Sequence, residues 1–130
     1  MVNKRIFLEN RSIGISPEDD SAIKGLNMTF GELRRANVRR LGHYEKCLDW
    51  APSQWFQAMV GEVGEYANFR KKYERGDLTL EEFKTEAAKE LADVQIYLDL
   101  LAHALDIDLG QAARDKFNEV SDRIGSDVKL

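Results

Sequence analysis

Two pairs of acidic residues stand on apolar helix faces, and this placement restricts the possible folds more than any other feature of the sequence. The pairs are Glu62-x-x-Glu65 and Glu90-x-x-Asp93. Successive residues of an α-helix are turned by about 100°. By that rotation Glu62 lies in an apolar stripe whose other members fall within about 60° of it: Trp55, Ala58, Met59, Tyr66 and Phe69. Glu65 lies at the edge of this stripe.

The second pair repeats the arrangement, with Asp93 at the margin of the face. The residues that share the face of Glu90 are Phe83, Ala87, Val94, Tyr97 and Leu101. A buried carboxylate is costly unless it protonates or finds a partner. Four converging carboxylates would be matched by a hard divalent cation, and oxygen-only ligands favour Mg²⁺, with Mn²⁺ as an alternative, over zinc.

The rest of the pattern predicts an all-α chain with four helices and no strand. Capping boxes begin helices at Thr29 and Thr79, Ser53 and Asp108 are the other predicted N-caps, and glycines end two of the helices. The predicted helices run from residues 29 to about 40, 53 to about 75, 79 to about 105 and 108 to about 124. The short turn between the middle two makes them antiparallel neighbours.

Two segments divide the chain. Residues 1–28 show no sustained hydrophobic period and are predicted to form an irregular N-terminal arm, whereas residues 29–130 form the helical domain. Near the start, the apolar triplet after Lys4 and Arg5 is too short for a signal-peptide core. No apolar run reaches the length of a membrane span.

Composition limits the function further. The 130 residues fit one domain, and 43% hydrophobic with 32% charged residues is typical of a globular protein. A net charge of −4 argues against nucleic acid as the main partner. The single cysteine, Cys47, excludes an internal disulfide framework and fits a reducing compartment. We therefore expect a cytoplasmic protein with neither a membrane nor nucleic acid as partner.

The acidic pairs also have purely structural interpretations. Buried acids paired with arginines of the first predicted helix would produce the same pattern, as would the acidic rim of an oligomer interface. A di-iron site is not indicated, because it requires Glu-x-x-His pairs and neither His43 nor His103 stands three residues after a glutamate. A calcium loop at Asp106 lacks its closing glutamate.

The acidic pairs and their surroundings resemble the all-α nucleoside triphosphate pyrophosphohydrolases, that is, the MazG-like enzymes and their dCTP-pyrophosphatase relatives. The resemblance is carried by GEVGE at the first pair, ELADVQIYL at the second and KFNEVSDRIG near the end, and it covers about residues 29 to 125. It implies a four-helix MazG-like bundle that assembles as a homodimer or homotetramer.

The same resemblance implies the chemistry. Such enzymes cleave an NTP or dNTP between the α- and β-phosphates, releasing a nucleoside monophosphate and pyrophosphate. Glu62, Glu65, Glu90 and Asp93 would hold Mg²⁺, and a carboxylate of the first pair, Glu62 or Glu65, would also act in catalysis by polarising the attacking water.

Six residues are candidates for binding the nucleotide. By resemblance Lys116 and Arg123 bind phosphates, Asn118 lies near the nucleoside, and Tyr97 matches a tyrosine one turn past the second acidic pair. Trp50 stands just before Pro52 and is either a core residue or a surface on which a base stacks.

The last candidate, Asn37, lies among the apolar positions of the first predicted helix. The same helix carries four arginines, Arg34, Arg35, Arg39 and Arg40. These arginines form a solvated face, or one or two of them reach toward phosphates.

We therefore expect a Mg²⁺-dependent pyrophosphohydrolase that acts in nucleotide pool control, with a dGTP-directed enzyme of phage type among the alternatives. The competing hypothesis is a non-catalytic helical interaction module that has kept the fold. A nucleic-acid binder that uses the arginines of the first predicted helix ranks third, because the net charge is negative and no recognition motif is present.

Overall fold

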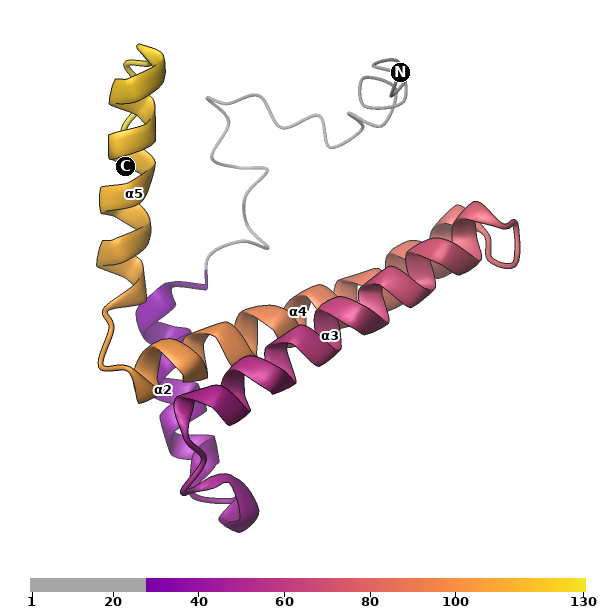
Figure 1. Cartoon of the computed structure of the whole chain (residues 1–130), viewed down its shortest axis with the longest axis horizontal. Coiled ribbons are helices and arrows are strands. Elements are labelled where there is room, and N and C mark those ends of the chain that lie inside the picture. The colour runs from indigo at the N-terminus through magenta and orange to yellow at the C-terminus, as the bar shows by residue number, and fades with distance from the viewer. Residues whose placement is uncertain (1–27) are drawn as a thin grey trace.

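The computed structural model describes residues 28–130, so the predicted arm of residues 1–28 lies outside the described residues except for Met28. The described chain contains α-helices and one short 3₁₀ helix, and no strand occurs within it (Figure 1). The elements are α2 (Phe30–Leu41), η2 (Glu45–Cys47), α3 (Pro52–Glu74), α4 (Leu80–Ala104) and α5 (Leu109–Ile124). The predicted all-α class with four α-helices is confirmed for these residues.

Local capping interactions explain where the helices begin. Thr29 and Thr79 each accept a hydrogen bond from the backbone N–H three residues later, and the glutamate at that position accepts one from the threonine N–H. Asp108 caps α5 by accepting from Gln111 N–H at 2.9 Å. The predicted Ser53 cap is wrong: Pro52 occupies the first position of α3, where its fixed φ and missing N–H are tolerated.

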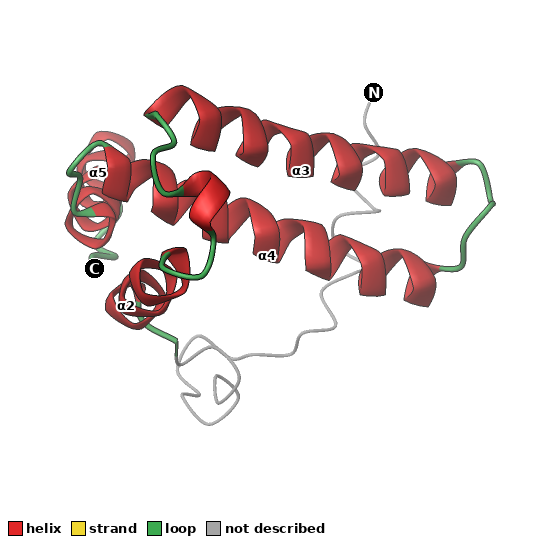
Figure 2. Cartoon of the chain, turned by 90° about the horizontal axis from the view of Figure 1, so that it is seen from below, coloured by secondary structure: helices red, strands yellow, loops and turns green. Residues whose placement is uncertain are grey.

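Helices α3 and α4 form a long antiparallel hairpin, which is the main packing unit of the chain (Figure 2). The chain reverses at Gly76, whose φ of 81° lies in the left-handed region that glycine adopts without strain. Phe83 of α4 is buried between Tyr66 and Tyr73 of α3, with ring centroids at 6.0 and 5.1 Å. The hairpin therefore holds the two acidic pairs in a fixed register.

Helix α2 crosses α4 at one end of the hairpin through a buried polar contact. Asp99 of α4 is only 1% exposed, and its two carboxylate oxygens accept from Arg34 Nε–H and Asn37 Nδ2–H of α2, each at 2.9 Å. Arg34 also donates to the carbonyls of Asp99 and Ile107, at 3.3 and 3.4 Å. This network attaches α2 to α4 and to the turn that leads into α5.

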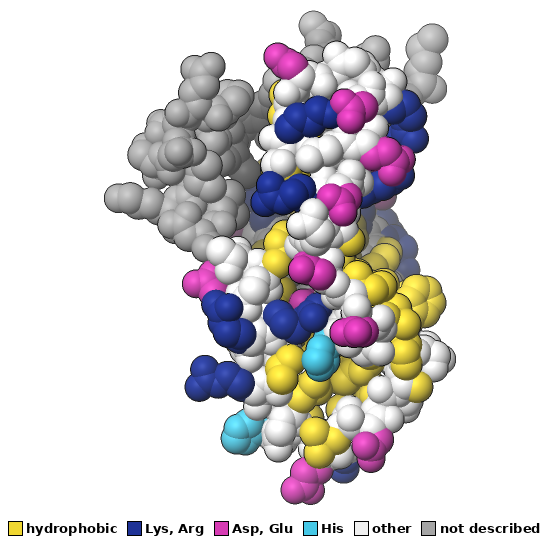
Figure 3. Space-filling view, turned by 90° about the vertical axis from the view of Figure 1, so that its left-hand side faces the viewer, with side chains coloured by type: hydrophobic (Ala, Val, Ile, Leu, Met, Phe, Trp, Pro, Cys, Tyr) yellow, Lys and Arg dark blue, Asp and Glu magenta, His cyan; other side chains and the backbone are white. Residues whose placement is uncertain are grey.

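Helix α5 extends away from the hairpin and contacts α2 rather than lying beside α3 and α4 (Figure 1). Within one chain the four helices therefore do not form a closed bundle. On the face shown in Figure 3, Lys and Arg side chains alternate with Asp and Glu along α5, and apolar side chains gather below it. None of the described helices has the length and apolar character that a membrane crossing requires.

Candidate metal centre and adjoining pocket

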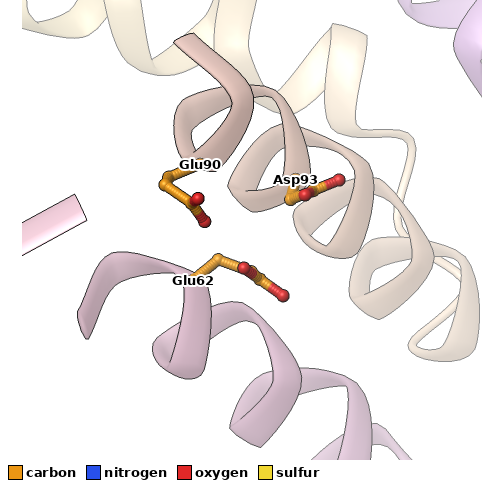
Figure 4. A group of neighbouring side chains, drawn as sticks. All are labelled: Glu62, Glu90 and Asp93. Carbon is orange, nitrogen blue, oxygen red and sulfur yellow. The ribbon is translucent and has the colours of Figure 1, made fainter. Parts of the chain in front are cut away.

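Three of the four predicted metal ligands come together at the middle of the hairpin. Glu62 of α3 faces Glu90 and Asp93 of α4, and one carboxylate oxygen from each lies within 4.8 Å of the other two (Figure 4). Glu62 and Glu90 are half-buried. Oxygens at this spacing are the donor set that a hard divalent cation takes.

The three carboxylates have no cationic partner among the described residues. None of them belongs to an ion pair, and the arginine of α2 that does pair with a buried acid, Arg34, is bound to Asp99. Pairing with the first helix therefore does not account for the acidic pairs within residues 28–130.

The surroundings of Glu62 all favour its protonated form. Desolvation by burial raises its pKa above 4.5, and a hydrogen bond with the Glu90 carboxyl and the charges of Asp93, Glu90 and Glu65 raise it further. Burial and the charges of Glu62 and Asp93 also raise the pKa of Tyr97. The site thus concentrates negative charge that a bound cation would relieve.

This raised pKa predicts a pH dependence of stability in protein kept metal-free with a chelator. The folded state holds the Glu62 proton more tightly than the unfolded state, so the contribution of Glu62 to stability falls as pH rises from about 4.5 through the folded pKa. Urea unfolding at a series of pH values measures the unfolding free energy of wild type and of Glu62→Gln. We expect the wild-type value to fall relative to the Glu62→Gln value as pH rises over this range.

Glu81→Gln, which removes an exposed carboxylate from the first turn of α4, is the control and should show no such trend. A wild-type minus Glu62→Gln difference that is the same at every pH would contradict the assignment.

The fourth predicted ligand, Glu65, is exposed and does not join the group of three. Its charge still acts on Glu62. The glycines on either side of Glu62, Gly61 and Gly64, are not needed for close packing within the chain, because a Cβ on either would meet no atom within 4 Å. Close approach of another helix therefore does not explain either glycine within the single chain.

A pocket of about 160 Å³ adjoins the acidic group and is bounded by α2, the η2 segment, α3 and α4. Three predicted site residues, Asn37, Trp50 and Tyr97, line it together with Asp93. The Trp50 and Trp55 ring centroids are 4.7 Å apart, and those of Trp55 and Tyr97 are 6.2 Å apart. Asp93 therefore belongs to both the acidic group and the aromatic pocket.

Asn37 is 2% exposed, and its side-chain amide is hydrogen-bonded to neighbouring residues of the protein. Its Nδ2 donates to Asp99 and, at 3.4 Å, to the Ile96 carbonyl. Its Oδ1 accepts from Arg40 at 3.4 Å. The apolar position that singled out Asn37 in the sequence is explained by this contact with α4.

The three candidates on α5 do not line the pocket. Lys116 pairs with Glu119 at 2.5 Å. Asn118 holds the C-terminal segment, accepting from Leu130 N–H at 2.9 Å and donating to the Leu130 carbonyl at 3.3 Å. Arg123 is exposed. Within one chain these residues lie on the helix that points away from the hairpin (Figure 1).

Two residues of this region, Asp99 and Trp55, are not among the site residues predicted from the sequence. Asp99 carried a signal, because it is the only charged residue in the run IYLDLLAHAL. Trp55 is buried, as its helix face predicts, but it also forms the pocket wall between Trp50 and Tyr97. Comparison of the chain with protein-family models, curated proteins and solved structures finds no match.

Proposed function

We propose that the protein is a Mg²⁺-dependent nucleotide pyrophosphohydrolase that cleaves an NTP or dNTP between the α- and β-phosphates in nucleotide pool control. The observation that carries the proposal is the position of Asp93, which contributes both to the group with Glu62 and Glu90 and to the aromatic pocket. A molecule that has a flat ring joined to a metal-binding polyanion suits that combination. The resemblance to MazG-like enzymes supports the same assignment.

The residues of the chain divide the task. Glu62, Glu90 and Asp93 would hold the cation, which when bound supplies charge neutralisation at the triphosphate and acidifies the attacking water. By the resemblance, a carboxylate of the first pair, Glu62 or Glu65, would also polarise that water. Trp50 and Tyr97 offer faces to the base, because aromatic side chains stack on nucleobases.

The proposal is tested by the products. Purified protein with Mg²⁺ is incubated with each common NTP and dNTP, and pyrophosphate is resolved from orthophosphate. We expect pyrophosphate and a nucleoside monophosphate in equal amounts from at least one nucleotide. Orthophosphate in place of pyrophosphate would contradict the cleavage position. No release from any nucleotide would favour the non-catalytic interaction module.

We also propose that a second copy of the chain covers the outer face of α3. Phe56, Val60 and Val63 lie on the face turned away from α4 and are 51, 46 and 48% exposed. Exposed apolar side chains grouped on one helix face indicate an interaction surface. The open space beside Gly61 and Gly64 would let a partner helix approach closely. Sedimentation equilibrium checks this, and a monomeric mass at all concentrations would contradict it.

A further inference from the structure

The pocket beside the acidic group has room for one flat heterocycle. Its volume of about 160 Å³ is close to that of cavities that admit benzene, about 150 Å³. Aromatic rings form part of the pocket wall and come from Trp50, Trp55 and Tyr97. If the ligand is a nucleotide, as the proposed function requires, the base occupies the pocket and the phosphates remain outside it.

Arg40 is the one cationic side chain among the described residues that line this pocket. An arginine donates hydrogen bonds and accepts none, and its planar group presents paired donors. The Nδ2 of Asn37, the neighbouring amide, already donates to Asp99 and Ile96. Arg40 is therefore the residue of α2 that can donate hydrogen bonds to a ligand in the pocket.

A chain of contacts that runs through two buried side chains, Asn37 and Asp99, holds Arg40 in place. Its guanidinium donates to Asn37 Oδ1 at 3.4 Å. Asn37 is oriented by Asp99, which is in turn held by Arg34. Asp99 and Asn37 are 1% and 2% exposed, so the two middle links are shielded from solvent, whereas Arg34 is 27% exposed and Arg40 is exposed.

We propose that Arg40 reads the edge of the base through paired donors, and that Asp99 is a positioning residue that acts on Arg40 through Asn37. Guanine presents two acceptors, O6 and N7, on one edge, and arginine pairs with both. Adenine offers N7 beside an amino group that repels the second donor. The pocket therefore selects guanine over adenine, two purines of nearly equal size and stacking surface.

Intrinsic fluorescence measures this selection directly. The chain contains two tryptophans, and both line the pocket, so quenching reports on occupancy of this pocket. The ligands are dGMP, dIMP, 7-deaza-dGMP and dAMP, which require no turnover. We expect dGMP to bind about tenfold or more tighter than dAMP, as for a bidentate arginine–guanine contact. dIMP keeps O6 and N7 and should match dGMP, whereas 7-deaza-dGMP, which lacks N7, should bind more weakly.

Substitutions then assign the selection to Arg40. Arg40→Ala should bring the affinities for dGMP and dAMP to within about twofold of each other, and Arg40→Lys, which keeps the charge without paired donors, should also lose most of the ratio. Arg39→Ala removes the same charge one residue earlier, outside the pocket wall, and should keep the ratio.

Asp99→Asn tests the positioning role. It should lower the dGMP:dAMP ratio several-fold while leaving the affinity for dAMP unchanged, a pattern that general destabilisation would not produce. If Asp99→Asn does not fold, Asn37→Ala removes the intermediate contact and should lower the ratio in the same way.

Several results would overturn the proposal: a dGMP:dAMP ratio near one, a ratio that survives Arg40→Ala, a loss as large in Arg39→Ala, or dIMP that binds like dAMP. Because monophosphates are used, the outcome is separate from the proposed reaction. If the dGMP:dAMP affinity ratio depends on Arg40 but the protein hydrolyses no nucleotide, the base selection is supported and the enzymatic assignment is contradicted. If the protein hydrolyses a nucleotide but the ratio does not depend on Arg40, the enzymatic assignment is supported and the base selection is contradicted.

Discussion

Pyrophosphate release by Glu62→Gln is expected to fall by more than about 100-fold relative to wild type. Loss of residues that merely support a metal ligand costs about 10- to 100-fold, and Glu62 would be a direct ligand, so its loss should cost more. The side chain keeps its size, so the hairpin should fold unchanged. Initial rates at saturating Mg²⁺ and nucleotide measure the effect.

A second measurement on the same variant is independent of catalysis. Binding of Mg²⁺ to the folded state alone raises stability, by about 2.7 kcal/mol at 100 times the Kd. Wild type should therefore show a Tm that increases with Mg²⁺, and Glu62→Gln should show much less of this increase. Without metal, Glu62→Gln should be the more stable protein at neutral pH, because it removes a carboxylate that its surroundings disfavour.

Two further variants calibrate these effects. Glu81→Gln removes an exposed charge from the same hairpin and should leave both the rate and the Mg²⁺ response unchanged. Glu65→Gln establishes whether the fourth predicted ligand contributes, since Glu65 lies outside the group of three. Full activity and an unchanged Mg²⁺ response in Glu62→Gln would contradict the metal centre.

Replacement of Asp99 by alanine should lower the unfolding free energy by about 3 kcal/mol. Breaking a buried charge pair costs about 3–5 kcal/mol, and the value lies at the low end because Arg34 is 27% exposed and can regain water. Asn37 would at the same time lose its carboxylate acceptor. Urea denaturation measures the change, and the Tm should fall by roughly 10 °C.

The matched control is Asp127→Ala, because Asp127 is exposed and lies beyond the last helix. It should change stability by less than about 0.5 kcal/mol. An Asp99→Ala protein as stable as the control would show that the contact between α2 and α4 is not held by this carboxylate. Arg34→Met breaks the same pair from the other side, so its effect should not add to that of Asp99→Ala.

The features that could be predicted from the sequence are those set by near neighbours. The threonine capping boxes placed the starts of α2 and α4, because both partners lie within one turn. Helical periodicity placed Glu62, Glu90 and Asp93 on facing surfaces, since the short turn at Gly76 leaves little freedom of register. Ser53 failed as a cap because Pro52 competes for the start of the same helix.

Features that depend on distant segments were not predictable in the same way. Asp99 and Arg34 are 65 positions apart, and no local sequence pattern predicts the contact between their side chains. The direction of α5 follows from the turn at Asp106, a non-glycine residue with a φ of 55°. This positive φ cannot be predicted from the sequence pattern. The pocket needs four separate segments, so its lining could not be read from any one helix.

All three carboxylates of the acidic group belong to the α3–α4 hairpin, whereas the pocket beside them also requires α2 and the segment around η2. Under the proposed function, the reaction and the choice of base are therefore encoded in different stretches of the gene. Substitutions in α2 can alter which base is accepted while the metal ligands stay untouched. A lineage that carries this hairpin could thus acquire a new nucleotide preference by changing its first described helix alone.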